Sequence, residues 1–129
     1  MPDPRSNLAV ILFAHGARDA RWAEPFRRVE AAVRAAAPGL AVELAFLEFM
    51  APDLATAIQS RANAGATRIR IVPLFFGQGG HLRNDVPAMV ADIAAALPGV
   101  SVTLGRAAGD DDGVIAALAA FCVSETSKS

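Results

Sequence analysis

Several residue types are scarce in this sequence, and each scarcity narrows what the protein can be. Its 129 residues include one cysteine, two histidines, one tryptophan and no tyrosine. The single Cys122 excludes an internal disulfide and indicates a reducing compartment, which we expect to be the cytoplasm. The net charge of −1 provides no general attraction for nucleic acid. Any imidazole chemistry must come from His15 or His81.

Long apolar runs are also absent. The first run, at 8–14, is far shorter than the roughly 20 residues of a membrane span. The polar leader 1–7 lacks the apolar region of a signal peptide, because His15 and Gly16 follow that short run at once. Hydrophobic residues nevertheless make up 53% of the chain, which excludes disorder. We expect one domain over 1–129, with an ordered core at about 8–122 and a frayed tail at 124–129.

Strand and helix patterns alternate along the chain. Runs rich in Val, Ile, Leu and Phe predict strands at 8–14, 41–48, 68–76 and 100–105. Apolar residues at helical spacing predict helices at 20–36, 53–64, 84–97 and 110–123. This order predicts an α/β three-layer sandwich: a four-stranded parallel sheet with helices on both faces and strand order 2-1-3-4. Cys122, in the last helix, is expected to be a small core residue.

Both histidines follow predicted strands. His15 comes directly after the first strand, and His81 follows the third across the loop 77–80. In open α/β sheets ligands bind at this edge, where the strand order reverses. In the order 2-1-3-4 the first and third strands are neighbours about 4.8 Å apart, so the two imidazoles can face one site. The alternative is two unrelated histidines in loops.

A carboxylate belongs to the same edge. Glu48 ends the second strand among large apolar residues, where burial is costly unless it is paired or binds a cation. Two imidazoles and one carboxylate form a divalent metal site with open positions, suited to Co, Ni, Fe or Zn. Catalytic sites keep such an incomplete set of ligands. The alternative is a solvated acid at a strand end.

Cationic and glycine residues surround these positions. Arg18 and Arg21 follow His15, and Arg83 follows His81. Guanidinium groups bind carboxylates and phosphates, so we expect an anionic ligand, although arginines at helix starts are often only solvated. Gly79 and Gly80 leave room for a flat or bulky ligand, and the phosphate-loop signature is absent.

Three motifs resemble those of the class II chelatases over roughly 8–120. They are His15-Gly16-x-Arg18, Phe46-Leu47-Glu48-Phe49 followed by Pro52, and Val72-Pro73-Leu74-Phe75 continuing through Gly79-Gly80-His81 to Asp85-Val86-Pro87. The most similar branch is the small sirohydrochlorin chelatases of cobalamin and sirohaem biosynthesis, often called sirohydrochlorin cobaltochelatases. Ala17 departs from the pattern, since many members carry Ser there, and the histidine-rich segment of some small members is absent.

The resemblance implies a chelatase-type α/β fold and a lyase that inserts a divalent metal into a polycarboxylated tetrapyrrole such as sirohydrochlorin. Co²⁺ is the first candidate, with Ni²⁺, Fe²⁺ and Zn²⁺ as alternatives, and the metal is substrate, so no permanently bound cofactor is expected. His15 and His81 would bind the metal and accept protons, with Glu48 as third ligand. The partners implied are the tetrapyrrole and a second copy in a homodimer, with neither nucleic acid nor membrane.

The chemistry of metal insertion fits these residue types. Two pyrrole N–H protons must leave while the ion passes from protein ligands to ring nitrogens, and imidazole, with an ordinary pKa of about 6.5, serves as ligand and as base. Arginines suit a polycarboxylated ring. Two other functions remain open: a non-catalytic carrier of metal or tetrapyrrole, and a flavodoxin-like module that binds a phosphorylated ligand at 77–80 and a helix start.

Overall fold

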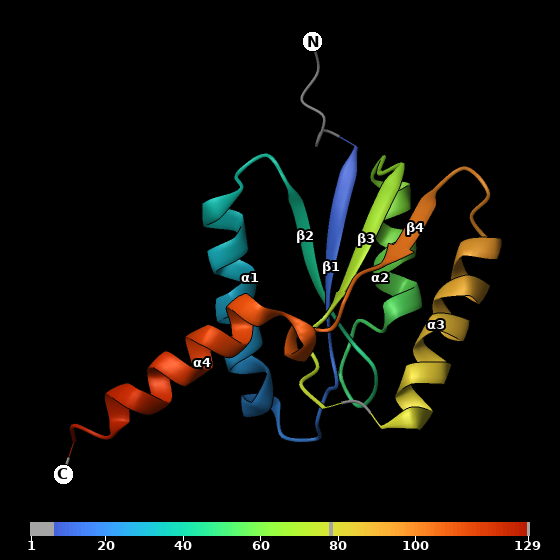
Figure 1. The fold of residues 1–129 in the computed structure, drawn as a ribbon. Helices are drawn as coiled ribbons and strands as arrows, with labels where there is room; N and C mark the ends of the chain where they lie inside the picture. The colour runs from blue at the N-terminus through green and yellow to red at the C-terminus, as the bar shows by residue number, and fades with distance from the viewer. Residues whose placement is uncertain (1–6, 78, 129) are drawn as a thin grey trace.

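The computed structural model describes residues 7–77 and 79–128, with the backbone alone at residue 81. The strands are β1 (Leu8–Ala14), β2 (Ala41–Phe46), β3 (Arg68–Pro73) and β4 (Ser101–Leu104). The α-helices are α1 (Glu24–Ala36), α2 (Leu54–Asn63), α3 (Gly80–Ala95) and α4 (Asp112–Glu125), and the 3₁₀ helices are η1 (Ala20–Ala23) and η2 (Ala108–Asp110). Figure 1 shows their arrangement.

The sheet confirms the predicted topology. All strand pairs are parallel, and the order is β2-β1-β3-β4. The central strand β1 is almost wholly buried, as expected of a parallel strand that is covered on both faces. Because the strands are parallel, the segments that follow β1, β2 and β3 all leave from one edge of the sheet (Figure 1).

The element boundaries differ from the predicted ones in a few places. β2 ends at Phe46 and β3 at Pro73, two and three residues before their predicted ends. The third helix begins at Gly80, not at Asn84, since Gly79 is extended (φ −66°, ψ 163°) and acts as the N-cap. His81, predicted to lie between the loop 77–80 and this helix, is therefore in the first turn of α3.

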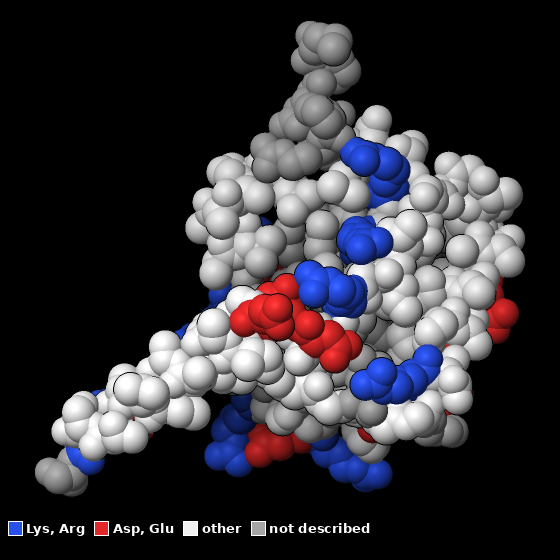
Figure 2. Space-filling view, in the orientation of Figure 1, with Lys and Arg blue, Asp and Glu red and all other residues white. Residues whose placement is uncertain are grey.

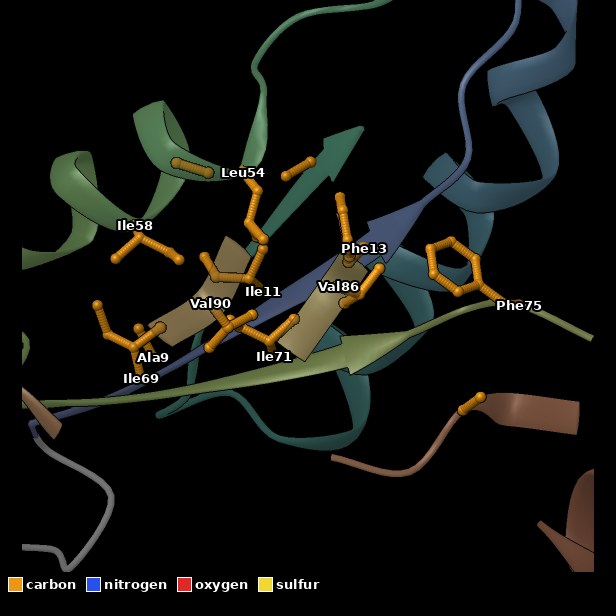
Figure 3. Packing of buried hydrophobic residues seen from close by; sticks show 13 residues of the cluster. Ala9, Ile11, Phe13, Leu54, Ile58, Ile69, Ile71, Phe75, Val86 and Val90 are labelled. Carbon is orange, nitrogen blue, oxygen red and sulfur yellow. The ribbon is translucent and has the colours of Figure 1, made fainter. Parts of the chain in front are cut away.

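Two apolar layers hold the helices on the sheet. One side packs Ile11, Phe13 and Ile71 against α2 and α3 (Figure 3). The other side packs Leu12 and Leu44 against η1 and α1, where the Trp22 and Phe26 rings lie 4.5 Å apart. Burying each such large side chain contributes about 1.5–3 kcal/mol, so these layers hold the sheet edge in place.

The last helix departs from the expected packing. α4 runs to Glu125, so residues 124 and 125 are helical rather than frayed as predicted. Figure 1 shows α4 projecting away from the sheet, and every residue from Ile115 onward that the structure describes is exposed. Cys122 is exposed as well, so the prediction that it is a core residue was wrong. The apolar pattern of this helix indicates burial, but the main contact of α4 is with the short η2.

None of the helices that the structure describes has the length and apolar character of a membrane-spanning helix.

Candidate functional site

The predicted site residues gather at the carboxyl edge of the sheet. His15 directly follows β1, and the segments after β2 and β3 begin on either side of it, because these strands flank β1. Glu48 comes two residues after β2. The backbone of His81 lies at the start of α3, the helix that follows β3, while its side chain lies outside the described residues.

Tilted aromatic contacts position the His15 imidazole. Its ring centroid lies 5.1 Å from that of Phe75, which in turn lies 5.5 Å from Phe13. Phe13 and Phe75 are buried, whereas His15 is only partly covered. Figure 3 shows Phe75 at the end of the buried cluster, beyond β3. The core therefore fixes one side of the imidazole and leaves the residue accessible from outside.

Backbone hydrogen bonds join the exits of β1 and β2. The Leu47 N–H donates to the Ala14 carbonyl (2.9 Å), and the Glu48 N–H donates to the His15 carbonyl (3.1 Å). Parallel pairing thus continues two residues past the end of β2. The backbones of the predicted ligands His15 and Glu48 are held directly against each other.

Gly16 makes this close approach possible. Its φ is +93°, and a Cβ added there would lie 1.9 Å from the Glu48 carbonyl oxygen. No other residue type fits both the backbone conformation and the space. The glycine of the His-Gly pair therefore has a steric role: it lets the loop after β2 lie against the loop after β1.

The chain then makes a strained turn at Phe49. Phe49 has φ +67°, and the Met50 N–H donates to the Glu48 carbonyl across it (2.9 Å), which is the geometry of a γ-turn with positive central φ. Such a conformation is costly for a bulky residue and is typical of functional sites. The turn leaves the Phe49 side chain 57% exposed, with the Arg18 guanidinium 4.8 Å from its ring centroid.

Sequence reasoning did not identify two exposed aromatic residues at this edge. Phe49 follows β2, and Phe76, which is 54% exposed, follows β3. Since β2 and β3 lie on either side of β1, these phenyl groups belong to the two segments that flank His15. The sequence did contain a signal for both residues: each is a large apolar residue in a loop at the edge where ligands bind, and exposed apolar groups that lie together often mark a binding surface.

The predicted cationic residues differ in their partners. Arg18 stacks on Phe49, whereas Arg21 forms a 2.7 Å ion pair with Asp19. The Arg21 side chain lowers the pKa of Asp19, and the Asp19 side chain raises the pKa of Arg21, through the hydrogen bonds of that pair. Arg83 is exposed and lines a cavity of about 240 Å³ together with Arg106.

Gly79 and Gly80, the N-cap and the first residue of α3, have no steric requirement for glycine. A Cβ added at Gly79 or Gly80 would meet nothing within 4 Å. Both are exposed, and their role in leaving room for a flat or bulky ligand stays a prediction.

Among the side chains that the structure describes, no three His, Cys, Asp or Glu groups lie together as a metal site. The His81 side chain lies outside the described residues, so the set His15, Glu48 and His81 stays a prediction. The structure does describe the partly exposed imidazole of His15 and the exposed carboxylate of Glu48, whose backbones are hydrogen-bonded to each other. Imidazole and carboxylate are ligands that borderline divalent ions accept.

A cleft of about 500 Å³ opens beside this edge, between α2 and α3. It is lined by apolar groups, including Leu47 and Met89, and by three acids, Asp53, Asp85 and Asp92. Asp53 caps α2, and its hydrogen bonds to the Thr56 side chain and backbone N–H lower its pKa. The cleft is acidic, so it suits a cationic rather than a polycarboxylated ligand.

Comparison with known proteins identifies the family. The family model CbiX matches residues 9–122. The chain belongs to the CbiX family. Among solved structures, a CbiX protein from Marinobacter aquaeolei VT8 superposes with a TM-score of 0.84 and 31% identity, over 95% of this chain and 99% of that one. The sirohydrochlorin chelatase SirB of Bacillus subtilis subspecies spizizenii, solved with cobalt, gives a TM-score of 0.76 at 25% identity over 88% of this chain and 49% of that one.

Curated relatives of this CbiX-family chain are named for two metals. A sirohydrochlorin cobaltochelatase of Saccharolobus solfataricus is 34% identical over 64% of this chain and 63% of its own length. A sirohydrochlorin ferrochelatase of Bacillus subtilis is 32% identical over 59% of this chain and 29% of its own length. The chain thus spans less than two thirds of the length of these relatives.

Proposed function

We propose that this CbiX-family chain is a metal chelatase, a lyase that inserts a divalent metal into a polycarboxylated tetrapyrrole such as sirohydrochlorin. The observation that carries the proposal is the backbone hydrogen bonding between the segments that follow β1 and β2. There the backbones of His15 and Glu48 are hydrogen-bonded, and Gly16 has no side chain to separate them. Family membership and relatives named sirohydrochlorin chelatases support it.

In the proposed reaction the metal is a substrate held for transfer. His15, Glu48 and His81 bind the ion, and open coordination positions face the incoming ring. Pyrrole protons leave to one or both imidazoles as ring nitrogens replace the protein ligands. The packing of His15 on Phe75 keeps its imidazole oriented throughout, so little reorganisation is needed during transfer.

The flat macrocycle requires apolar walls and cationic contacts. We place it against the exposed phenyl groups of Phe49 and Phe76, with Arg18, Arg21 and Arg83 near its carboxylates and the space beside Gly79 and Gly80 for its edge. The exposure of both phenyl groups and the stacking of Arg18 on Phe49 support this placement. Aromatic faces stack well on conjugated rings.

Co²⁺ is the first candidate metal. The curated relative named for cobalt is matched over 63% of its length, against 29% for the relative named for iron. Ligand chemistry does not discriminate among Co²⁺, Ni²⁺, Fe²⁺ and Zn²⁺, because imidazole and carboxylate suit all of them. We further propose a homodimer in the cytoplasm, in which the lone exposed Cys122 stays reduced.

The test is metallation of sirohydrochlorin followed by its visible spectrum. Purified protein is incubated with sirohydrochlorin and Co²⁺, Ni²⁺ or Fe²⁺ in turn, beside a sample without protein. The chelatase predicts faster formation of the metallated spectrum with catalytic turnover. A carrier would bind stoichiometrically without acceleration, and a flavodoxin-like module would bind flavin or nucleotide and leave the reaction at its spontaneous rate. Either result would overturn the proposal.

A further inference from the structure

A second, smaller cavity lies at the carboxyl edge of the sheet, on the β4 side of β3. Its volume is about 240 Å³, and its lining includes the last residues of two strands, Pro73 of β3 and Leu104 of β4. Residues of α3 and of η2 complete the lining, so we call it the α3–η2 cavity. Pockets that hold a whole ligand have volumes of about 300–1,000 Å³, so this cavity suits one side chain of a larger ligand.

The α3–η2 cavity combines buried apolar groups with exposed charged ones. Val86 and Ala107 are buried, whereas Arg83, Arg106 and Asp110 are exposed. The lining therefore has two guanidinium groups against one carboxylate. Figure 2 shows Lys and Arg side chains gathered on this face over β3, next to the acidic side chains at the start of α4. Apolar walls with guanidinium groups beside them fit a carboxylate on a short aliphatic arm.

The cap of α4 holds the Arg106 guanidinium in place. Its Nη2 donates to Asp111 Oδ1 (2.9 Å), and Asp111 Oδ2 accepts from the Val114 N–H (3.1 Å). The Asp111 carboxylate thus lies at the positive end of the α4 dipole, which offsets part of its negative charge. A guanidinium has five N–H donors, so the pair with Asp111 leaves donors for a ligand.

A chain of contacts joins this cavity to His15. The Gly109 N–H donates to the Phe75 carbonyl (2.9 Å), which holds η2 against the segment after β3. A Cβ at Gly109 would lie 2.2 Å from the Phe76 carbonyl oxygen, so this approach requires glycine. The Phe75 ring in turn lies 5.1 Å from the His15 imidazole. The position of Arg106 is therefore fixed relative to the proposed metal site.

The strand order sets the separation of the cavity from that site. β4 lies two strands from β1, so the ends of these two strands are about 10 Å apart. The exposed Phe76 follows β3, the strand between them. In a tetrapyrrole the metal lies at the centre of the ring and the carboxylates lie at its periphery. A ring centred near His15 and lying over Phe76 therefore directs one peripheral carboxylate toward the α3–η2 cavity.

We infer that the α3–η2 cavity receives one acidic side chain of the tetrapyrrole and that Arg106, together with Arg83, binds its carboxylate. This inference rests on the proposed function and adds to it a substrate-binding residue, Arg106, and the subsite that contains it. The apolar lining contacts the methylene groups of the side chain while the guanidinium groups bind its carboxylate. The subsite fixes the rotation of the ring in its own plane, so the same pyrrole nitrogens always face the metal ligands.

Binding of metal-free sirohydrochlorin to the full chain tests the subsite, with the fluorescence of the tetrapyrrole as the signal. Arg106→Gln should raise Kd about tenfold, the loss of one charge-assisted hydrogen bond at an exposed position. Arg106→Lys keeps the charge and should recover part of the affinity. Arg28→Gln is the matched control, because it removes an exposed arginine from α1, which does not line the cavity. An Arg106→Gln protein with the Kd of wild type overturns the inference.

A second variant separates ligand binding from support of the α4 cap. Asp111→Asn breaks the ion pair with Arg106, but asparagine still caps a helix. If Arg106 binds the carboxylate, Asp111→Asn should bind sirohydrochlorin as tightly as wild type or more tightly. If Arg106 only holds Asp111, the two variants should lose affinity equally, and that result overturns the inference.

Metallation kinetics distinguish this inference from the proposed function. Arg106→Gln should raise the KM for sirohydrochlorin and leave kcat nearly unchanged, because the subsite binds ground state and transition state alike. A wild type that accelerates Co²⁺ insertion beside an Arg106→Gln protein of unchanged KM overturns the subsite and leaves the chelatase. A wild type that binds sirohydrochlorin through Arg106 without accelerating insertion overturns the chelatase and supports the subsite.

Discussion

Replacing Gly16 with alanine tests the junction that joins the two strand exits. The added Cβ would lie 1.9 Å from the Glu48 carbonyl oxygen, and the residue would have to keep φ near +93°. The left-handed backbone costs a side-chain-bearing residue about 1–2 kcal/mol. Moving the Glu48 backbone away sacrifices its hydrogen bond to the His15 carbonyl, about 0.5–1.5 kcal/mol. We expect Gly16→Ala to lower the free energy of unfolding by about 2–3 kcal/mol.

Urea denaturation followed by circular dichroism measures this loss, with Gly99→Ala as the matched control. A Cβ at Gly99 meets nothing within 4 Å, and Gly99 is not among the glycines with positive φ. We expect Gly99→Ala to change stability by about 0.5 kcal/mol or less. Equal stabilities of the two variants, or a loss below about 0.5 kcal/mol at Gly16, would refute the steric account of the His-Gly pair.

Three further predictions follow from individual contacts. Phe49→Gly removes an exposed ring and relieves a strained φ of +67°, so the free energy of unfolding should stay the same or rise. The KM for sirohydrochlorin should increase about tenfold, because the variant loses the phenyl group proposed to contact the macrocycle. An unchanged KM would show that Phe49 does not contact the substrate. Asp53→Ala removes the α2 cap and should cost about 1 kcal/mol at pH 7, whereas Asp53→Asn keeps the cap. Because hydrogen bonding to Thr56 lowers the pKa of folded Asp53, the part of its contribution that depends on charge is present above the unfolded pKa of about 3.9 and is lost as pH falls through the folded value. The gap between the thermal melts of wild type and Asp53→Ala should therefore narrow below about pH 4. Gly109→Ala places a Cβ 2.2 Å from the Phe76 carbonyl oxygen and should cost about 1–3 kcal/mol in urea denaturation, with the unhindered Gly77→Ala as its control.

The sheet was predictable because its signals are local and repeated. The apolar runs at β1 and β3 and the alternation of strands with helices determine a parallel sheet, and the observed order β2-β1-β3-β4 confirms the prediction. Because the strands are parallel, the segments after β1, β2 and β3 leave the sheet at the same edge. This placed His15 and Glu48 next to each other, as the sequence predicted. The Gly80 start of α3 was missed because Asn84 looks like a helix cap, whereas a glycine N-cap has no distinctive side chain.

The rest depends on contacts that no periodic pattern encodes. The γ-turn that exposes Phe49 follows from backbone pairing between two loops, which the sequence of either loop does not reveal. The exposure of α4 and Cys122 was missed for a related reason. An apolar helix indicates burial, but its sequence does not say whether its own chain or another copy provides the cover.

The most direct test of the central claim compares Co²⁺ insertion into sirohydrochlorin by wild type and by His15→Ala. Gln59→Ala, on the exposed surface of α2, serves as the control. The proposed site predicts that His15→Ala keeps its fold by circular dichroism but loses at least a hundredfold in kcat/KM, while Gln59→Ala matches wild type. A folded His15→Ala protein that inserts Co²⁺ at the wild-type rate would contradict the account.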